Sequence, residues 1–77
     1  MDINGFIANF ADQFDETDPS NITAETAFHD LPDYSSLVAL SIIAMIDEEY
    51  DVQLSGNDMR SSVTVEDLFN LVKSRKD

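Results

Sequence analysis

The sequence predicts an all-α fold, a bundle of three longer helices and one short helix, with a long loop between the first and second helices. Three observations indicate this class. Apolar residues recur at the three- and four-residue spacing of helices. No apolar and polar alternation is long enough for a sheet, and turn-forming residues gather in a few segments. A length of 77 residues predicts one domain covering positions 1–77.

The first helix is expected to run from the beginning of the chain to about Phe14. Its apolar stripe consists of Ile3, Phe6, Ile7, Phe10 and Phe14. The next stretch, 15–26, reads DETDPSNITAET and is rich in acids and turn formers, so it predicts a long loop. A loop of this length needs buried side chains to hold it. The expected anchors are Ile22, Phe28 and Leu31.

The second helix is expected to begin near Ser35 or Ser36 and to run to about Tyr50. Pro32 disfavours helix in the residue before it, which marks a boundary. Asp33 or Ser35 is expected to cap the helix, because a short polar side chain can accept a hydrogen bond from a first-turn amide. The helix is apolar nearly all round. It is therefore expected to be central in the bundle, to present an apolar outer face to another molecule, or both.

Two further helices are expected in the last third of the chain. The turn residues at 55–58 lead into a short helix that carries Met59. Thr64 is expected to cap the last helix, with Asp67 three residues later as a weak capping box. The residues expected to face inward from this helix are Val65, Leu68, Phe69 and Val72.

The charge of the chain is strongly negative, with 16 acidic residues against 4 basic residues and a formal net charge of -12. Arg60 is the first basic residue, so positions 1–59 carry only negative charge. Such a surface repels nucleic acid and anionic lipid and attracts basic protein surfaces. We expect no nucleic-acid partner, no membrane insertion and a monomeric state. No signal peptide or spanning segment is visible, so the default expectation is a cytoplasmic protein.

The sequence offers little catalytic equipment. Cysteine is absent, which excludes a disulfide or thiolate chemistry from the chain itself. His29 is the only histidine, and a triad of Ser36, His29 and Asp33 would lack the glycine-rich turn of a nucleophile elbow. We therefore expect no catalytic residues and no enzymatic activity of the chain's own.

A calcium loop is also not expected. Four acids have the spacing of positions 1, 3, 5 and 12 of such a loop: Asp47, Glu49, Asp51 and Asp58. The sixth position is Val52, where the sharp turn of the loop requires glycine. No metal site is therefore expected.

A set of short motifs resembles the acyl carrier protein family over most of the chain. Phe28 and Leu31 are followed by SSL at 35–37, where the family has D-S-L. An apolar helix then leads to DEEYDV at 47–52, similar to the family's E-E-F or E-E-Y with a small aliphatic residue. The segment TVEDLFNLV at 64–72 lies where the last helix of the family begins with T-V. The resemblance implies an acyl-carrier-like helical bundle.

In that family, a separate transferase attaches 4′-phosphopantetheine from coenzyme A to the serine, and the arm's thiol carries cargo as a thioester. The family distance of fourteen residues back from Tyr50 leads to Ser36. Leu37 is expected to anchor this turn in the core. The resemblance implies a stand-alone acyl carrier for enzymes of fatty-acid, polyketide or related lipid biosynthesis. An aminoacyl or peptidyl carrier with the same chemistry, and an unmodified acidic interaction module, remain as alternatives.

The implied partners are a phosphopantetheinyl transferase and acyl-ligase, ketosynthase or acyltransferase-type enzymes with basic docking patches. The residues expected to contact them are Ser35, Leu37, Val38, Ala39, Ile42, Asp47 and Glu48. The residues expected to line a cargo site beside the second helix are Leu40, Ile43, Met59, Val63 and Phe69. Ser35 stands where the family has aspartate, which removes one acid from the docking surface for the transferase and supplies a second hydroxyl.

Overall fold

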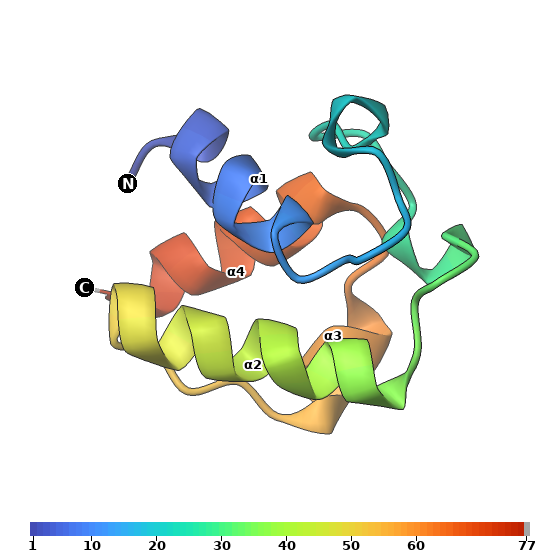
Figure 1. Ribbon diagram of the computed structural model, residues 1–77. Helices are drawn as coiled ribbons and strands as arrows, with labels where there is room; N and C mark the ends of the chain where they lie inside the picture. The colour runs from blue at the N-terminus through green and yellow to red at the C-terminus, as the bar shows by residue number, and fades with distance from the viewer. Residues whose placement is uncertain (77) are drawn as a thin grey trace.

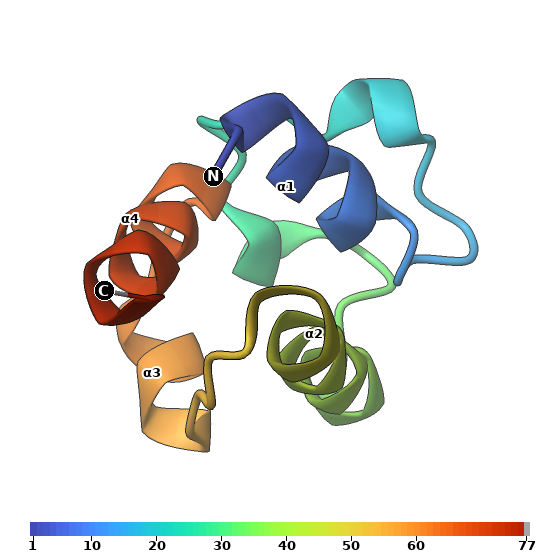
Figure 2. The same cartoon turned by 90° about the vertical axis from the view of Figure 1, so that its left-hand side faces the viewer.

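The computed structural model describes residues 1–76 and confirms the predicted helical bundle (Figure 1). The helices are α1 (Ile3–Ala11), α2 (Ser36–Tyr50), α3 (Gly56–Ser61) and α4 (Val65–Lys76). Each of the three longer helices packs against the other two. The second view shows α2 almost along its axis, with α1 above it and the short α3 beneath α4 (Figure 2).

The first helix ends earlier than its apolar stripe predicts. Asp2 caps α1 by accepting a hydrogen bond from the backbone N–H of Gly5 at 3.2 Å. The predicted end at Phe14 was wrong, because the α-helix stops at Ala11. The Phe14 N–H donates to the Ala11 carbonyl at 3.0 Å, three residues back instead of four, so the chain tightens at this point. Phe14 still reaches the core.

The core is built around aromatic side chains of α1. Phe6 lies edge-on to Phe69 of α4 with ring centroids 5.4 Å apart. Phe10 meets Phe28 of the long loop in the same way at 5.4 Å. Truncating one such buried ring to alanine typically costs ~3–5 kcal/mol, which is comparable to the whole net stability of a core this small. The position of α1 between its neighbours is therefore fixed by these rings.

The long loop between α1 and α2 is held to the bundle. Ile22 and Phe28 are buried and Leu31 is partly buried, so the three predicted anchors are confirmed. Short 3₁₀ turns form at Pro19–Asn21 and Phe28–Asp30. The loop leaves the lower end of α1, rises to a turn at the top right and then descends along the right side to the start of α2 (Figure 1).

The backbone amides at the start of α4 find hydrogen-bond partners in the helix cap and in the long loop. The Asp67 N–H donates to the Thr64 hydroxyl at 3.1 Å, and the Asp67 carboxylate accepts from the Thr64 N–H at 3.0 Å. This reciprocal pair confirms the predicted capping box. The Val65 N–H donates to the Thr26 carbonyl at 3.1 Å, so the loop satisfies another amide of the first turn.

An ion pair joins α3 to the last turns of α4. Arg75 donates from both terminal nitrogens to the Asp58 carboxylate, at 2.7 and 2.8 Å. Asp58 also forms a capping box with Ser55 at the start of α3. The hydrogen bonds from Arg75, and then the one from the Ser55 amide, hold the pKa of Asp58 well below its usual range. Within residues 1–76 it is the one ion pair, and it ties the two helices together.

We predict that Asp58→Asn lowers the free energy of unfolding at pH 7 by about 1 kcal/mol, because it weakens both the cap and the pair with Arg75. The folded-state pKa is depressed, so the wild-type advantage is present above the unfolded pKa of ~3.9 and is lost as the pH falls below it. Urea denaturation at pH 7 and at several lower pH values measures this.

The control is Glu25→Gln, which removes one negative charge from an exposed loop position. It corrects for the relief of repulsion that any lost acid gives in a chain of net charge -12. Equal stability changes in the two variants at pH 7 would contradict a special role for Asp58.

Candidate functional site

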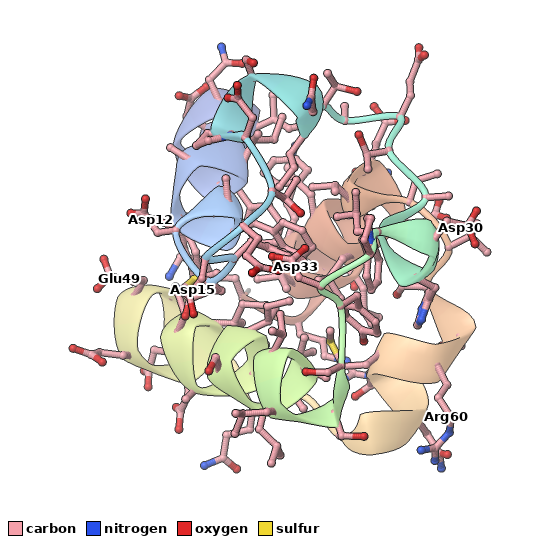
Figure 3. The ribbon with its side chains drawn as sticks, turned by 45° about the vertical axis from the view of Figure 1, so that its right-hand side comes forward. Asp12, Asp15, Asp30, Asp33, Glu49 and Arg60 are labelled. Carbon is pink, nitrogen blue, oxygen red and sulfur yellow. The ribbon has the colours of Figure 1, made fainter. Side chains whose placement is uncertain are left out.

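The two adjacent serines at the start of α2 have different environments. The Ser35 hydroxyl caps the helix by accepting a hydrogen bond from the Val38 N–H at 3.2 Å. Asp33, the other predicted cap, instead accepts from backbone amides of the long loop at 3.0 and 3.2 Å (Figure 3). Ser36 is the first residue of α2 and is exposed. None of the hydrogen bonds found among residues 1–76 uses its hydroxyl, which leaves that group available for chemistry.

An open hollow of about 370 Å³ lies beside Ser36. Its apolar walls come from α2 and α3 and comprise Ala39, Leu40, Ile43 and Met59. Its polar lining residues include His29, Tyr34, Ser36 and Arg60. Mainly apolar walls with a few polar groups, at a volume of this size, are typical of small-molecule sites. The hollow therefore places an apolar surface next to an available hydroxyl.

His29 fixes one side of the hollow. Its Nε2 atom lies 2.9 Å from the carbonyl oxygens of both Met59 and Ser62. Because both partners can only accept, Nε2 carries a hydrogen. The imidazole ring also stacks on Phe28, with ring centroids 4.4 Å apart, and meets Tyr34 edge-on at 5.0 Å. His29 therefore ties the long loop to the end of α3.

A catalytic triad is not assembled. The Nε2 atom of His29 is already bonded to backbone carbonyls, and no hydrogen bond within residues 1–76 connects it to Ser36. Asp33 accepts hydrogen bonds from the Thr17 hydroxyl and from the amides of Glu16 and Thr17, and these bonds, the one from the hydroxyl first, keep the pKa of its carboxyl below the usual value. Within residues 1–76, these contacts do not connect Ser36 to His29 or Asp33 as a triad would.

The orientation of α2 overturns the expected place of Leu37. Its side chain is 74% exposed, so the prediction that Leu37 anchors the turn in the core was wrong. The buried face of α2 is formed by Ile42, Met45 and Ile46. At about 100° per residue, Leu37 is rotated by roughly 140° from Ile42 and faces outward. Leu40 lies on the same outer side and is 62% exposed.

The predicted docking residues are divided between surface and core. Ile42 was expected on the outer side of α2, and this was wrong because it is fully buried. Val38 and Ala39 are partly buried and pack against the core. Asp47 and Glu48 are exposed as expected. The large apolar side chains that α2 presents to solvent are therefore Leu37 and Leu40.

The predicted cargo residues are also divided. Leu40, Ile43 and Met59 line the hollow. Val63 is 59% exposed on the connection between α3 and α4 and is not among the lining residues. Phe69 belongs to the core, against Phe6. Neither residue lines the hollow, which opens between α2 and α3, so a part for them in a cargo site stays a prediction.

Three lining residues escaped the sequence analysis as members of this site. They are Tyr34, Gly56 and Arg60. His29 was considered only as a catalytic base. Tyr34 directly precedes the two serines, which was the one available signal. Burial raises the pKa of its phenol above the usual value. Arg60 gave no local signal because its proximity to Ser36 arises from the packing of α3 beside α2.

No protein-family model, curated protein or solved structure matches the chain. Among residues 1–76, no three histidine, aspartate or glutamate side chains are grouped in a way that would hold a metal ion. In the same part of the chain, no helix has the length and apolar character to cross a membrane. The features that point to a function are therefore Ser36, the hollow beside it and the motif pattern of the sequence.

We predict that Ser35→Ala lowers the free energy of unfolding by about 1 kcal/mol, because it removes the cap of α2. Ser36→Ala is expected to change it by less than about 0.5 kcal/mol, since the Ser36 hydroxyl is exposed and uninvolved in the cap. Urea denaturation of the two variants beside the wild type measures both values. A larger loss in Ser36→Ala than in Ser35→Ala would overturn this assignment of the two hydroxyls.

Proposed function

We propose that this chain is a carrier protein that receives 4′-phosphopantetheine on Ser36 and presents acyl thioesters to partner enzymes. The observation that carries the proposal is the exposed Ser36 hydroxyl at the start of α2, next to an apolar hollow. The motif pattern from Phe28 to the start of α4 supports it independently. As a carrier, the chain needs no catalytic activity of its own, because the transferase and the partner enzymes perform the reactions.

The residues around Ser36 fit a phosphopantetheine group. Ser35 keeps its hydroxyl in the helix cap, which leaves Ser36 as the free nucleophile for the transferase. A phosphodiester on Ser36 lies at the positive end of the α2 dipole, where negative charge is favoured. When bound, the group supplies the thiol that this cysteine-free chain lacks, and this thiol carries the cargo as a thioester.

The hollow is suited to apolar cargo. Leu40, Ile43 and Met59 offer an apolar wall that begins beside the attachment point. Met59 is unbranched and adaptable, so it can move to admit a chain. Acyl groups of fatty-acid, polyketide or related lipid pathways have this chemistry. Aminoacyl or peptidyl cargo is the second candidate, because His29 and Tyr34 place polar groups at the hollow.

The outer face of α2 is suited to basic partner enzymes. Leu37 and Leu40 give it an exposed apolar patch near Ser36. Asp47 and Glu48 add negative charge farther along the helix. Such a patch fits weak, electrostatically steered docking of a transferase and of acyl-ligase, ketosynthase or acyltransferase-type enzymes. The alternative, an unmodified interaction module, would use the same face without modification of Ser36.

We predict that a broad-specificity phosphopantetheinyl transferase with coenzyme A modifies the wild type and Ser35→Ala but not Ser36→Ala. Adjacent helical residues point about 100° apart, so the two hydroxyls cannot occupy one transferase site in the same way. Intact-mass spectrometry reports the addition of one phosphopantetheine group, and circular dichroism confirms that each variant is folded. Modification of Ser36→Ala, or no modification of the folded wild type, would refute the assignment.

We also predict that Leu37→Gln lowers kcat/KM for transferase modification roughly fivefold to tenfold, the size expected for an apolar contact worth ~1–1.4 kcal/mol. The matched control is Val63→Gln, because Val63 is similarly exposed but lies between α3 and α4. Thermal melts should show both variants folded. Equal kinetics for the two variants would show that the outer face of α2 does not contact the transferase.

A further inference from the structure

We propose that the guanidinium of Arg60 pairs with the phosphodiester attached to Ser36 and holds the first part of the arm against the hollow. This inference rests on the proposed function, because it needs the phosphodiester on Ser36. Arg60 would position the arm from α3, and it lies outside the sequence motif that surrounds Ser36.

Arg60 lies close to the hollow beside Ser36. Arg60 and Ser36 both line the same hollow, although they come from different helices. Figure 3 shows Arg60 on α3, at the end of the molecule where α2 begins. Its guanidinium folds back along α3: Nη2 donates to the Asn57 side-chain oxygen, and Nη1 lies 3.4 Å from where a Cβ on Gly56 would be. Gly56 is itself a lining residue, so the cation lies beside the hollow.

The guanidinium of Arg60 is available to bind an anion. Of the lysine and arginine side chains within residues 1–76, Arg60 alone borders the hollow. Arg75 is engaged by Asp58, and Lys76 donates to the Tyr50 carbonyl at 2.9 Å. The side-chain partner of Arg60 is a neutral amide, that of Asn57. Arg60 can therefore turn toward an anion without breaking a bond to a carboxylate.

The negative charge of a phosphodiester on Ser36 is stabilised by a nearby cation. A phosphodiester adds negative charge to a chain that already has a net charge of -12. Its neighbours in the sequence, Ser35 and Leu37, are neutral and cannot offset it. An arginine guanidinium is planar and presents several N–H donors in a fork that matches phosphate oxygens. Arg60 therefore supplies a compensating charge with the matching geometry at this place in the bundle.

The experiment compares the melting temperatures of the apo and holo forms of the wild type and three variants. Arg60→Gln removes the cation, Arg60→Lys keeps the charge without the fork, and Lys73→Gln removes an exposed cation of α4 that does not line the hollow. Intact mass establishes the modification of each sample before melting.

The change in melting temperature from apo to holo is expected to be more favourable in the wild type than in Arg60→Gln by about 2–4 °C at low ionic strength. The difference should shrink at ~1 M salt, where the Debye length is about 3 Å. Lys73→Gln should behave as the wild type, and Arg60→Lys should lie between wild type and Arg60→Gln. Equal apo-to-holo changes in wild type and Arg60→Gln would overturn the inference.

A second measurement uses the wild type alone. The ¹⁵N and ¹H NMR signals of the Arg60 side-chain Nε–H should shift between apo and holo protein, while those of Arg75 stay in place. If Arg60→Gln resists modification, this comparison decides, and an unchanged Arg60 signal overturns the pairing. A wild type that is folded but never modified overturns both this inference and the proposed function. A modified wild type without any Arg60 dependence overturns only the pairing.

Discussion

The burial of one face of α2 against the aromatic stripe of α1 is the constraint on which the rest of the molecule depends. Ile42 and Ile46 are fully buried, and Met45 lies beside them. Once these side chains enter the core, the rotation of the whole helix is fixed, because each residue follows at about 100°. Leu37 and Leu40 must then face solvent. The apolar outer surface near Ser36 is thus a direct consequence of how the core is filled.

Polar contacts from outside α2 give the site its shape. His29 bonds two carbonyls at the end of α3 and so holds the long loop and α3 on either side of the hollow. The pair of Asp58 and Arg75 fixes the other face of α3 against α4. Because these contacts join segments far apart in the chain, α3 stays beside α2 although it is only a short helix. The hollow exists because α3 is held in this position.

The charge distribution gives the site a polarity that the net charge does not reveal. The chain is acidic throughout its first 59 residues, and Asp12, Asp15 and Glu49 gather at the end of the molecule formed by α1 and the last turn of α2 (Figure 3). The opposite side, where α2 begins, holds the exposed apolar side chains and Arg60, together with Asp30 of the loop (Figure 3). On the proposed function, a basic partner enzyme would be steered by one part of the surface and would act at another. On the proposed function, such a separation would suit an arm on Ser36 that is presented to several partners in turn.

The sequence by itself determined the helices, the inward faces of α1 and α4, the loop anchors and the capping pair of Thr64 and Asp67. These features follow from local spacing, which needs no knowledge of distant residues. It also singled out Ser36, through the motif pattern. Only the tertiary structure decided which way α2 is turned, because a helix that is apolar nearly all round has no single inward stripe to detect. The same packing decided that Asp33 serves the loop, that α1 ends at Ala11, and that Arg60 comes to lie at the hollow beside Ser36.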